Sequence, residues 1–138
     1  MSTTTSSSTL RPPMKERWLR AAMLIDAAVT GANGLAYVVA AALLTTVLGP
    51  PVPFLIGIGV FLASYAIVIL LVSRARSIPP AGVWFAIVMN AAWSAASVIH
   101  MITADWLTPA GRVWAVLQAV VVLGFAVAQM IGLHRTRS

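Results

Sequence analysis

Four long apolar segments dominate the chain, at residues 18–48, 52–73, 81–104 and 108–132. An α-helix needs about 20 residues to cross the hydrocarbon core of a bilayer, and each segment is at least that long. None of them alternates between apolar and polar residues, as the roughly ten-residue strands of a membrane barrel do. The pattern predicts an all-α protein, a membrane-embedded antiparallel four-helix bundle. Because the first segment is longer than a span requires, we expect it to tilt or to begin along the membrane interface.

The breaks between these segments contain residues that stop or start helices. Glycine and proline end a helix, and Thr108 followed by Pro109 is typical of an N-cap and a first helical residue. All three connections are short, which predicts that neighbouring helices run antiparallel. The breaks read LGPPVP (48–53), RARSIPPAG (74–82) and ADWLTPAG (104–111).

The two ends of the chain have a different composition from the segments. The Ser/Thr-rich start, MSTTTSSSTLRPP, has too little apolar mass to fold, so we expect residues 1–17 to form a disordered tail. Met14 is an alternative start of translation, in which case most of this tail is not made. Residues 134–138 are expected to form a short C-terminal tail.

The composition points to lipid as the main partner. The chain of 138 residues is 60% hydrophobic and 9% charged, whereas a soluble domain is about 25% charged. A monomer of this size cannot hide so much apolar surface in its own core, so its outside faces the bilayer. A second copy or another membrane protein is a further expected partner.

The positive charge indicates topology and excludes nucleic acid as a partner. The net charge is +6, but the basic residues gather at the ends of the apolar segments instead of lining one helix face. In a protein with an even number of spans, eight of the nine basic residues would lie on one side of the membrane, and Arg112 alone would lie on the other. The positive-inside rule then predicts a multi-pass protein of the bacterial cytoplasmic membrane with both termini in the cytoplasm. The eight are Arg11, Lys15, Arg17, Arg20, Arg74, Arg76, Arg135 and Arg137.

Polar side chains form a stripe inside the first segment. Asp26, Thr30, Asn33 and Tyr37 are spaced i, i+4, i+7 and i+11, which places them on one helix face. An acid near the middle of a membrane helix costs about 2.5–3.5 kcal/mol, so Asp26 should face protein or water instead of lipid.

The other segments contain polar residues that can meet this stripe. We expect them to complete an intramembrane polar seam between the helices. Their depths in the membrane make three of them, Tyr65, Asn90 and Gln129, the expected hydrogen-bond partners of Asp26. The seam residues outside the first segment are Tyr65, Asn90, Ser94, Ser97, His100, Gln118 and Gln129.

The seam has two interpretations. Amides and hydroxyls can simply hold membrane helices together, at about 0.6 kcal/mol per bond. This favours a non-enzymatic structural or accessory subunit. Alternatively, the seam is the pathway of a small proton-coupled carrier or channel that uses Asp26 and the midplane residues Asn33 and Asn90, with His100 at its far end.

Other chemistry finds little support in the sequence. There is no cysteine, and the two histidines, His100 and His134, fall on opposite sides of the membrane and cannot share a haem iron. The three acids do not cluster as metal ligands do, and no nucleophile with a base and an orienting group is evident. We therefore expect no catalytic residue, no metal, no cofactor and no enzymatic activity.

Several runs of sequence resemble those of known small membrane proteins. LRAAMLIDAAVTGANGLAYVVAAALL, GVFLASYAIVILL, NAAWSAASV and WAVLQAVVV are similar to small four-span integral membrane proteins of actinobacteria, over most of residues 18–133. This resemblance implies four spans and no particular activity. The layout is also similar to that of the small multidrug-resistance carriers, which have one acid in their first helix, although theirs is Glu and the residues around Asp26 do not match.

Overall fold

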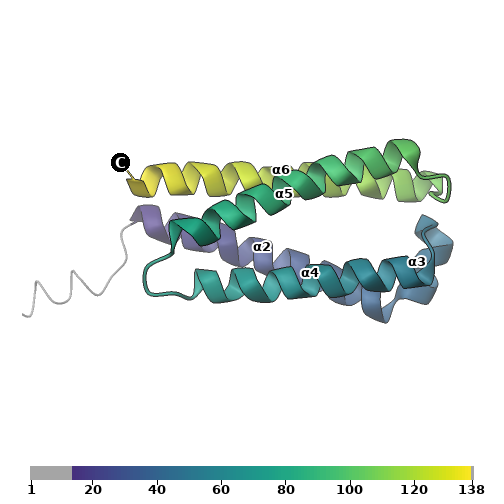
Figure 1. Ribbon diagram of the computed structural model, residues 1–138, viewed down its shortest axis with the longest axis horizontal. Helices are drawn as coiled ribbons and strands as arrows, with labels where there is room; N and C mark the ends of the chain where they lie inside the picture. Colours follow the sequence, from purple (N-terminus) through teal and green to yellow (C-terminus); the bar gives the residue numbers. More distant parts are fainter. Residues whose placement is uncertain (1–13, 138) are drawn as a thin grey trace, which may run out of the picture.

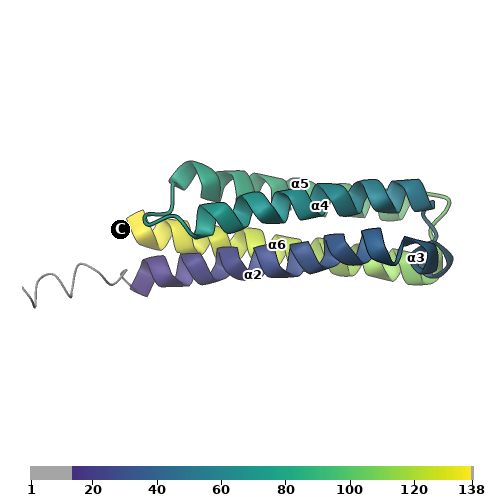
Figure 2. The ribbon, with the colours of Figure 1, turned by 90° about the horizontal axis from the view of Figure 1, so that it is seen from below.

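The computed structural model describes residues 14–137, and this part of the chain is almost entirely helical, without strands. Four long helices lie side by side, alternating in direction, and the short α3 lies at one end of them (Figures 1 and 2). The predicted all-α antiparallel bundle is confirmed. The helices are α2 (Met14–Val39), α3 (Ala41–Leu48), α4 (Val52–Ser73), α5 (Pro80–Thr103) and α6 (Pro109–Arg137).

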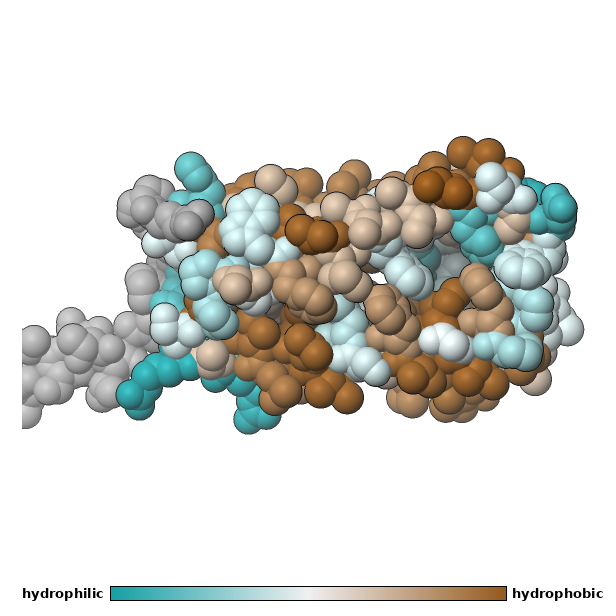
Figure 3. All heavy atoms as spheres, in the orientation of Figure 1, coloured by the Kyte–Doolittle hydropathy of each residue, from teal (hydrophilic) through white to brown (hydrophobic). Residues whose placement is uncertain are grey.

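The long helices have the length and composition of membrane spans. The apolar stretches are Glu16–Val39, Val52–Ser73, Pro80–Thr103 and Pro109–Thr136. Large aliphatic and aromatic side chains are exposed along all of them, and the face in Figure 3 is mainly brown in the middle, with teal residues at its two ends. The chain is therefore a multi-pass integral membrane protein whose outer surface contacts lipid, as predicted.

The two ends of the bundle differ in charge. One end, here called the basic end, holds the start of α2, the α4–α5 connection and the end of α6 (Figure 1). The other, here called the α3 end, holds α3 and the α5–α6 connection. Arg112 is the one arginine or lysine of the described residues at the α3 end.

The first apolar segment does not form one helix, which corrects the expected continuous span 18–48. The chain bends at Ala40, whose φ and ψ are −107° and 21°, and α3 then turns across the end of the bundle. The surplus length is therefore taken up at the far end of the span, not at its start. The bend buries Ala41 and Leu48 of α3 in a core cluster with Leu55 of α4, and burial of these side chains explains the bend.

The predicted N-terminal tail was too long. Helix α2 begins at Met14, so the last four residues assigned to the tail are helical, and residues 1–13 lie outside the described part of the chain. Glu16 in the first turn complements the helix dipole, and it pairs with Arg20 one turn later at 3.3 Å. These local interactions extend the helix beyond the apolar residues.

The predicted C-terminal tail is also helical in its described part, because α6 continues to Arg137. Leu133 is buried in the core, and the Arg135 guanidinium lies 5.5 Å above the Trp18 ring. These contacts hold the last turns of α6 against α2.

The helices begin and end at the capping residues that the sequence predicted. Thr108 caps α6, because its hydroxyl accepts a hydrogen bond from the Gly111 N–H at 3.0 Å, and Pro109 is the first residue of the helix. Gly49 ends α3 with φ at +112°, and a Cβ there would clash with the carbonyl oxygen of Trp106.

Two arginines bind the carbonyl ends of helices that are distant in sequence. The Arg20 guanidinium of α2 donates to the Ser73 carbonyl oxygen at the end of α4, and to that of Ala75 at 2.8 Å. The Arg112 guanidinium of α6 donates to the carbonyl oxygen of Met101 near the end of α5. Each arginine therefore satisfies carbonyl groups that a helix end leaves without partners.

The bundle consists of two tight hairpins, α2 with α4 and α5 with α6, joined mainly by contacts between α2 and α6. Glycines let the first hairpin close: a Cβ on Gly34 would lie 2.8 Å from the carbonyl oxygen of Gly59 and from the backbone nitrogen of Ala63. Helices α4 and α5 touch very little. The two hairpins therefore leave space between them in the middle of the bundle.

Candidate functional site

Asp26 lies at the centre of a hydrogen-bond network that joins all four long helices. Its side chain is 0% exposed. One carboxyl oxygen accepts a hydrogen bond from Thr30 Oγ1 at 2.9 Å. The other accepts from Tyr65 OH at 2.9 Å, Asn90 Nδ2 at 2.9 Å and Gln129 Nε2 at 2.8 Å. The three partners predicted on other helices are therefore its partners in the structure, and Thr30 from the same stripe is a fourth.

All four of these bonds run toward the carboxyl group of Asp26. The second N–H of Asn90 is used as well, in a bond of 3.2 Å to Gln129 Oε1. Among the described residues no buried side-chain nitrogen or oxygen lacks a partner. The carboxyl group of Asp26 therefore has all its hydrogen-bond partners inside the bundle.

The network is closed toward the basic end by an apolar core. Between Asp26 and that end the helices bury aliphatic side chains from α2, α4, α5 and α6. This core separates Asp26 from the basic end of the bundle. The core there includes Leu19, Met23, Ile69, Val83 and Leu133.

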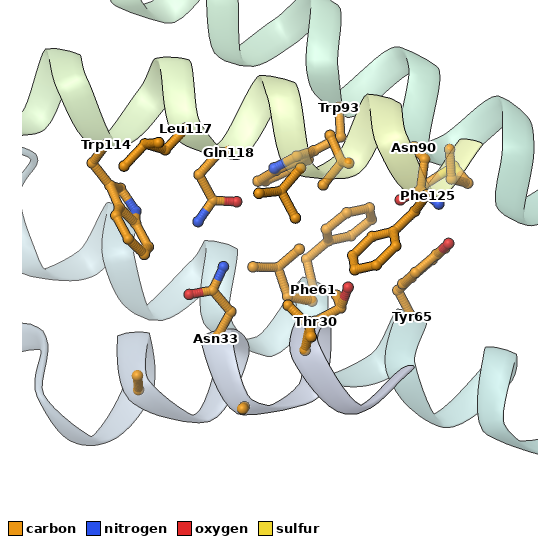
Figure 4. A pocket seen from close by; sticks show the side chains of 17 residues that line it. Thr30, Asn33, Phe61, Tyr65, Asn90, Trp93, Trp114, Leu117, Gln118 and Phe125 are labelled. Atoms are coloured by element: carbon orange, nitrogen blue, oxygen red, sulfur yellow. The ribbon is translucent and has the colours of Figure 1, made fainter. Parts of the chain in front are cut away.

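On the opposite side of the network lies a cavity of about 410 Å³, between the two hairpins (Figure 4). Three partners of Asp26, namely Thr30, Tyr65 and Asn90, form part of its wall. Most of the remaining wall is apolar, with four more large aromatic side chains. These are Phe61, Trp93, Trp114 and Phe125.

Two amides enter this cavity from opposite sides. Figure 4 shows Asn33 pointing into it from α2 and Gln118 from α6. Within the described residues the Asn33 side chain makes no hydrogen bond, and Gln118 makes one, from Nε2 to Tyr37 OH at 3.4 Å. Both amides therefore keep unused hydrogen-bonding capacity inside the membrane.

Tyr37 contacts two residues of the cavity wall, Trp114 and Gln118, and itself lines the smaller cavity at the α3 end. Its buried hydroxyl accepts a hydrogen bond of 2.6 Å from Trp114 Nε1. This contact joins α2 to α6 on the α3-end side of the cavity. The bond between Asp26 and Gln129 joins the same helices on its basic-end side.

The remaining seam residues lie apart from Asp26. Ser94 is buried and donates to the Ala119 carbonyl oxygen at 2.9 Å, which ties α5 to α6. Ser97 and His100 line a smaller cavity of about 60 Å³ at the α3 end. His100 Nε2 accepts a hydrogen bond of 2.9 Å from Trp106 Nε1.

The predicted seam residues fall into three adjoining groups, because Asn90 belongs to the first two and Gln118 lines both cavities. They are the Asp26 network, the cavity with Asn33 and Gln118, and the pair Ser97 and His100 near the α3 end. Asp26 is buried, whereas His100 is half-buried.

Sequence reasoning missed the role of Phe61. Its ring stacks on that of Trp93 with 5.6 Å between centroids, which bridges α4 and α5, two helices that touch little. The available signal was its position one turn before Tyr65, on the same face of α4.

The described residues contain no group of three or more histidine, aspartate or glutamate side chains that could hold a metal ion. Comparison with known proteins adds no further assignment: no protein-family model, no curated protein and no solved structure matches this chain.

Proposed function

We propose that this is a non-enzymatic membrane protein that binds a small, mainly apolar molecule in the cavity between its two hairpins. The observation that carries the proposal is the cavity itself, at about 410 Å³. Ligand sites are typically 300–1,000 Å³, apolar in most of their lining, with a few polar groups that orient the ligand. All four long helices contribute to this wall, and few of its side chains are polar.

A space of this size between the hairpins leaves the surrounding side chains short of contacts unless a molecule fills it. Protein interiors are close-packed, and side chains around a void lose contacts with their neighbours. Here bulky aromatic residues surround the space without filling it, while the Asp26 network holds the four helices together beside it. A bound molecule would restore the missing contacts.

The cavity also favours the carrier among the functions inferred from the sequence. Thr30, Tyr65 and Asn90 each contact Asp26 and also line the cavity, so a ligand that displaces one of them changes the hydrogen bonding of the acid. Such a link between ligand and acid is what a proton-coupled carrier needs.

A structural or accessory subunit is the second candidate. It is favoured by the complete pairing of the Asp26 network, since fully satisfied polar groups hold membrane helices in one arrangement. In this case the cavity would hold lipid chains and no specific ligand.

We further propose that the protein lies in the bacterial cytoplasmic membrane with the basic end inside, in keeping with its resemblance to small four-span actinobacterial proteins. The gathering of arginines at that end, against Arg112 at the other, supports this orientation. A fluorescent protein fused to the C-terminus should fluoresce, whereas alkaline phosphatase fused there should be inactive. The opposite result would reverse the orientation.

Bromobenzene tests ligand binding, because bromine quenches tryptophan and the cavity is lined by Trp93 and Trp114. In phosphatidylcholine vesicles the protein should show quenching that saturates with the bromobenzene content of the bilayer. The variant Ala32→Phe fills part of the cavity and should lower the affinity of the saturable bromobenzene binding at least tenfold. Its control, Ala28→Phe, is exposed on the same helix outside the cavity and should leave this affinity unchanged.

Quenching that rises linearly, without saturation, and that is equal in both variants would overturn this proposal. It would indicate contact with bromobenzene dissolved in lipid only, and the structural candidate would then be preferred.

A further inference from the structure

We infer that the cavity takes an uncharged, bilayer-dissolved molecule with an aromatic-sized apolar body and one hydrogen-bonding group, which enters sideways between α2 and α6. Asn33 and Gln118 would bind the polar group. This inference rests on the proposed binding function and adds the class of ligand, the residues that recognise it and its route.

The polar group of the ligand follows from the two amides. Asn33 offers two N–H donors and a carbonyl oxygen, none of them paired within the described residues, and Gln118 offers its free carbonyl oxygen. The two side chains face the same space from α2 and α6 (Figure 4). A hydroxyl or amide between them can donate to one and accept from the other.

The apolar body of the ligand follows from the rest of the wall. Phe61, Trp93 and Phe125 present ring surfaces to the cavity, and the space between them suits one flat or compact apolar group. The remaining lining is mainly aliphatic.

The absence of charge in the ligand follows from the charges around the cavity. None of the residues that line it is Asp, Glu, Lys or Arg. Asp26 itself is 0% exposed, and its oxygens already accept four hydrogen bonds, so the carboxyl group presents no free oxygen to the cavity. An ionic ligand would lose its hydration there without gaining a partner of opposite charge.

The route follows from the way α2 and α6 meet. They contact each other on the basic-end side of the cavity through Asp26 and Gln129, and on its α3-end side through Tyr37 and Trp114.

Between these two contacts the wall is open to the outside. Val29 of α2 and Leu117 and Val121 of α6 line the cavity and are at the same time 43%, 51% and 44% exposed on the surface. The small side chains of Ala32 and Ala36 lie beside them. This window, defined by these five residues, faces the bilayer, whereas the apolar core closes the path from the basic end.

The test compares 4-bromophenol with bromobenzene, since the two differ by one hydroxyl. Affinities are expressed as the mole fraction of probe in phosphatidylcholine vesicles, which removes the difference in partitioning. The protein should bind 4-bromophenol about tenfold more tightly, as one or two added hydrogen bonds would allow. Asn33→Leu and, separately, Gln118→Leu should remove this preference while bromobenzene still binds. The control Ser64→Ala removes an exposed hydroxyl bonded within its own helix and should keep the preference.

The outcomes separate this inference from the proposed function. Saturable binding of both probes with equal affinity would overturn the inference and leave the proposed function standing. Absence of saturable quenching by either probe would overturn both. Tighter binding of the cation (4-bromobenzyl)trimethylammonium than of 4-bromophenol would overturn the inference that the ligand is uncharged.

The route is tested by rates. Val121→Ala widens the window and should speed the association of 4-bromophenol several-fold. Val120→Ala, on the neighbouring lipid-facing position outside the cavity, should not change the rate. Equal association rates in the two variants would overturn entry between α2 and α6.

Discussion

Gln129 donates a hydrogen bond of 2.8 Å to the carboxyl group of Asp26, across 103 positions of sequence. Both side chains are 0% exposed. The bond joins the first long helix to the last, and thereby one hairpin to the other. The acid therefore lies on the basic-end side of the cavity, next to residues of the cavity wall but not among them.

Replacement of Gln129 by leucine should destabilise the protein by about 1–2 kcal/mol, because Asp26 and Asn90 each lose a partner in a buried place. Thermal unfolding in detergent, followed by circular dichroism, measures the change. Ser64→Ala serves as control and should alter stability by less than about 0.5 kcal/mol. Equal stability of Gln129→Leu and the unmodified protein would contradict a supporting role for this bond.

Gly34→Ala should separate α2 from α4 and cost about 1–3 kcal/mol, because the new methyl group meets backbone atoms that cannot move alone. Gly57→Ala is the matched control on α4, where a Cβ would meet nothing within 4 Å. This change should leave the fold intact and raise stability by up to about 1 kcal/mol, since alanine favours a helix. Similar unfolding temperatures for the two variants would contradict the close approach at Gly34.

Arg20→Leu should loosen the connection between α4 and α5, because the carbonyl groups of Ser73 and Ala75 lose their donor. Hydrogen exchange should rise about tenfold at the backbone amides of residues 74–78, with a loss of about 1 kcal/mol in stability. Arg17→Leu, exposed on the same helix, is the control and should leave this exchange unchanged. Equal exchange in both variants would show that Arg20 does not hold this connection.

Acid should release Trp106 from His100. The histidine accepts the tryptophan N–H at Nε2, and an imidazolium ring has no nitrogen left to accept a hydrogen bond. The bond is therefore present while His100 is neutral and is lost as pH falls through the range in which histidine takes up a proton. Tryptophan emission should change in that range in the unmodified protein, and this change should disappear in His100→Phe. Persistence of the same pH dependence in His100→Phe would assign it to another group.

The sequence by itself determined the class, the number of spans and the partners of Asp26. Each of these follows from local or one-dimensional physics. An apolar run of about 20 residues fits a bilayer, proline and glycine mark where such a run stops, and helical spacing puts Asp26, Thr30 and Asn33 on one face. Depth along antiparallel helices then matches Asp26 with Tyr65, Asn90 and Gln129.

Only the tertiary structure decided how the helices pair across the bundle. The close contact at Gly34, the weak contact between α4 and α5, and the bend at Ala40 depend on how whole surfaces fit together. No local pattern encodes that fit, since many packings bury the same polar stripe. For this reason the cavity, the unpaired amide of Asn33 and the window between α2 and α6 became visible only in the folded chain.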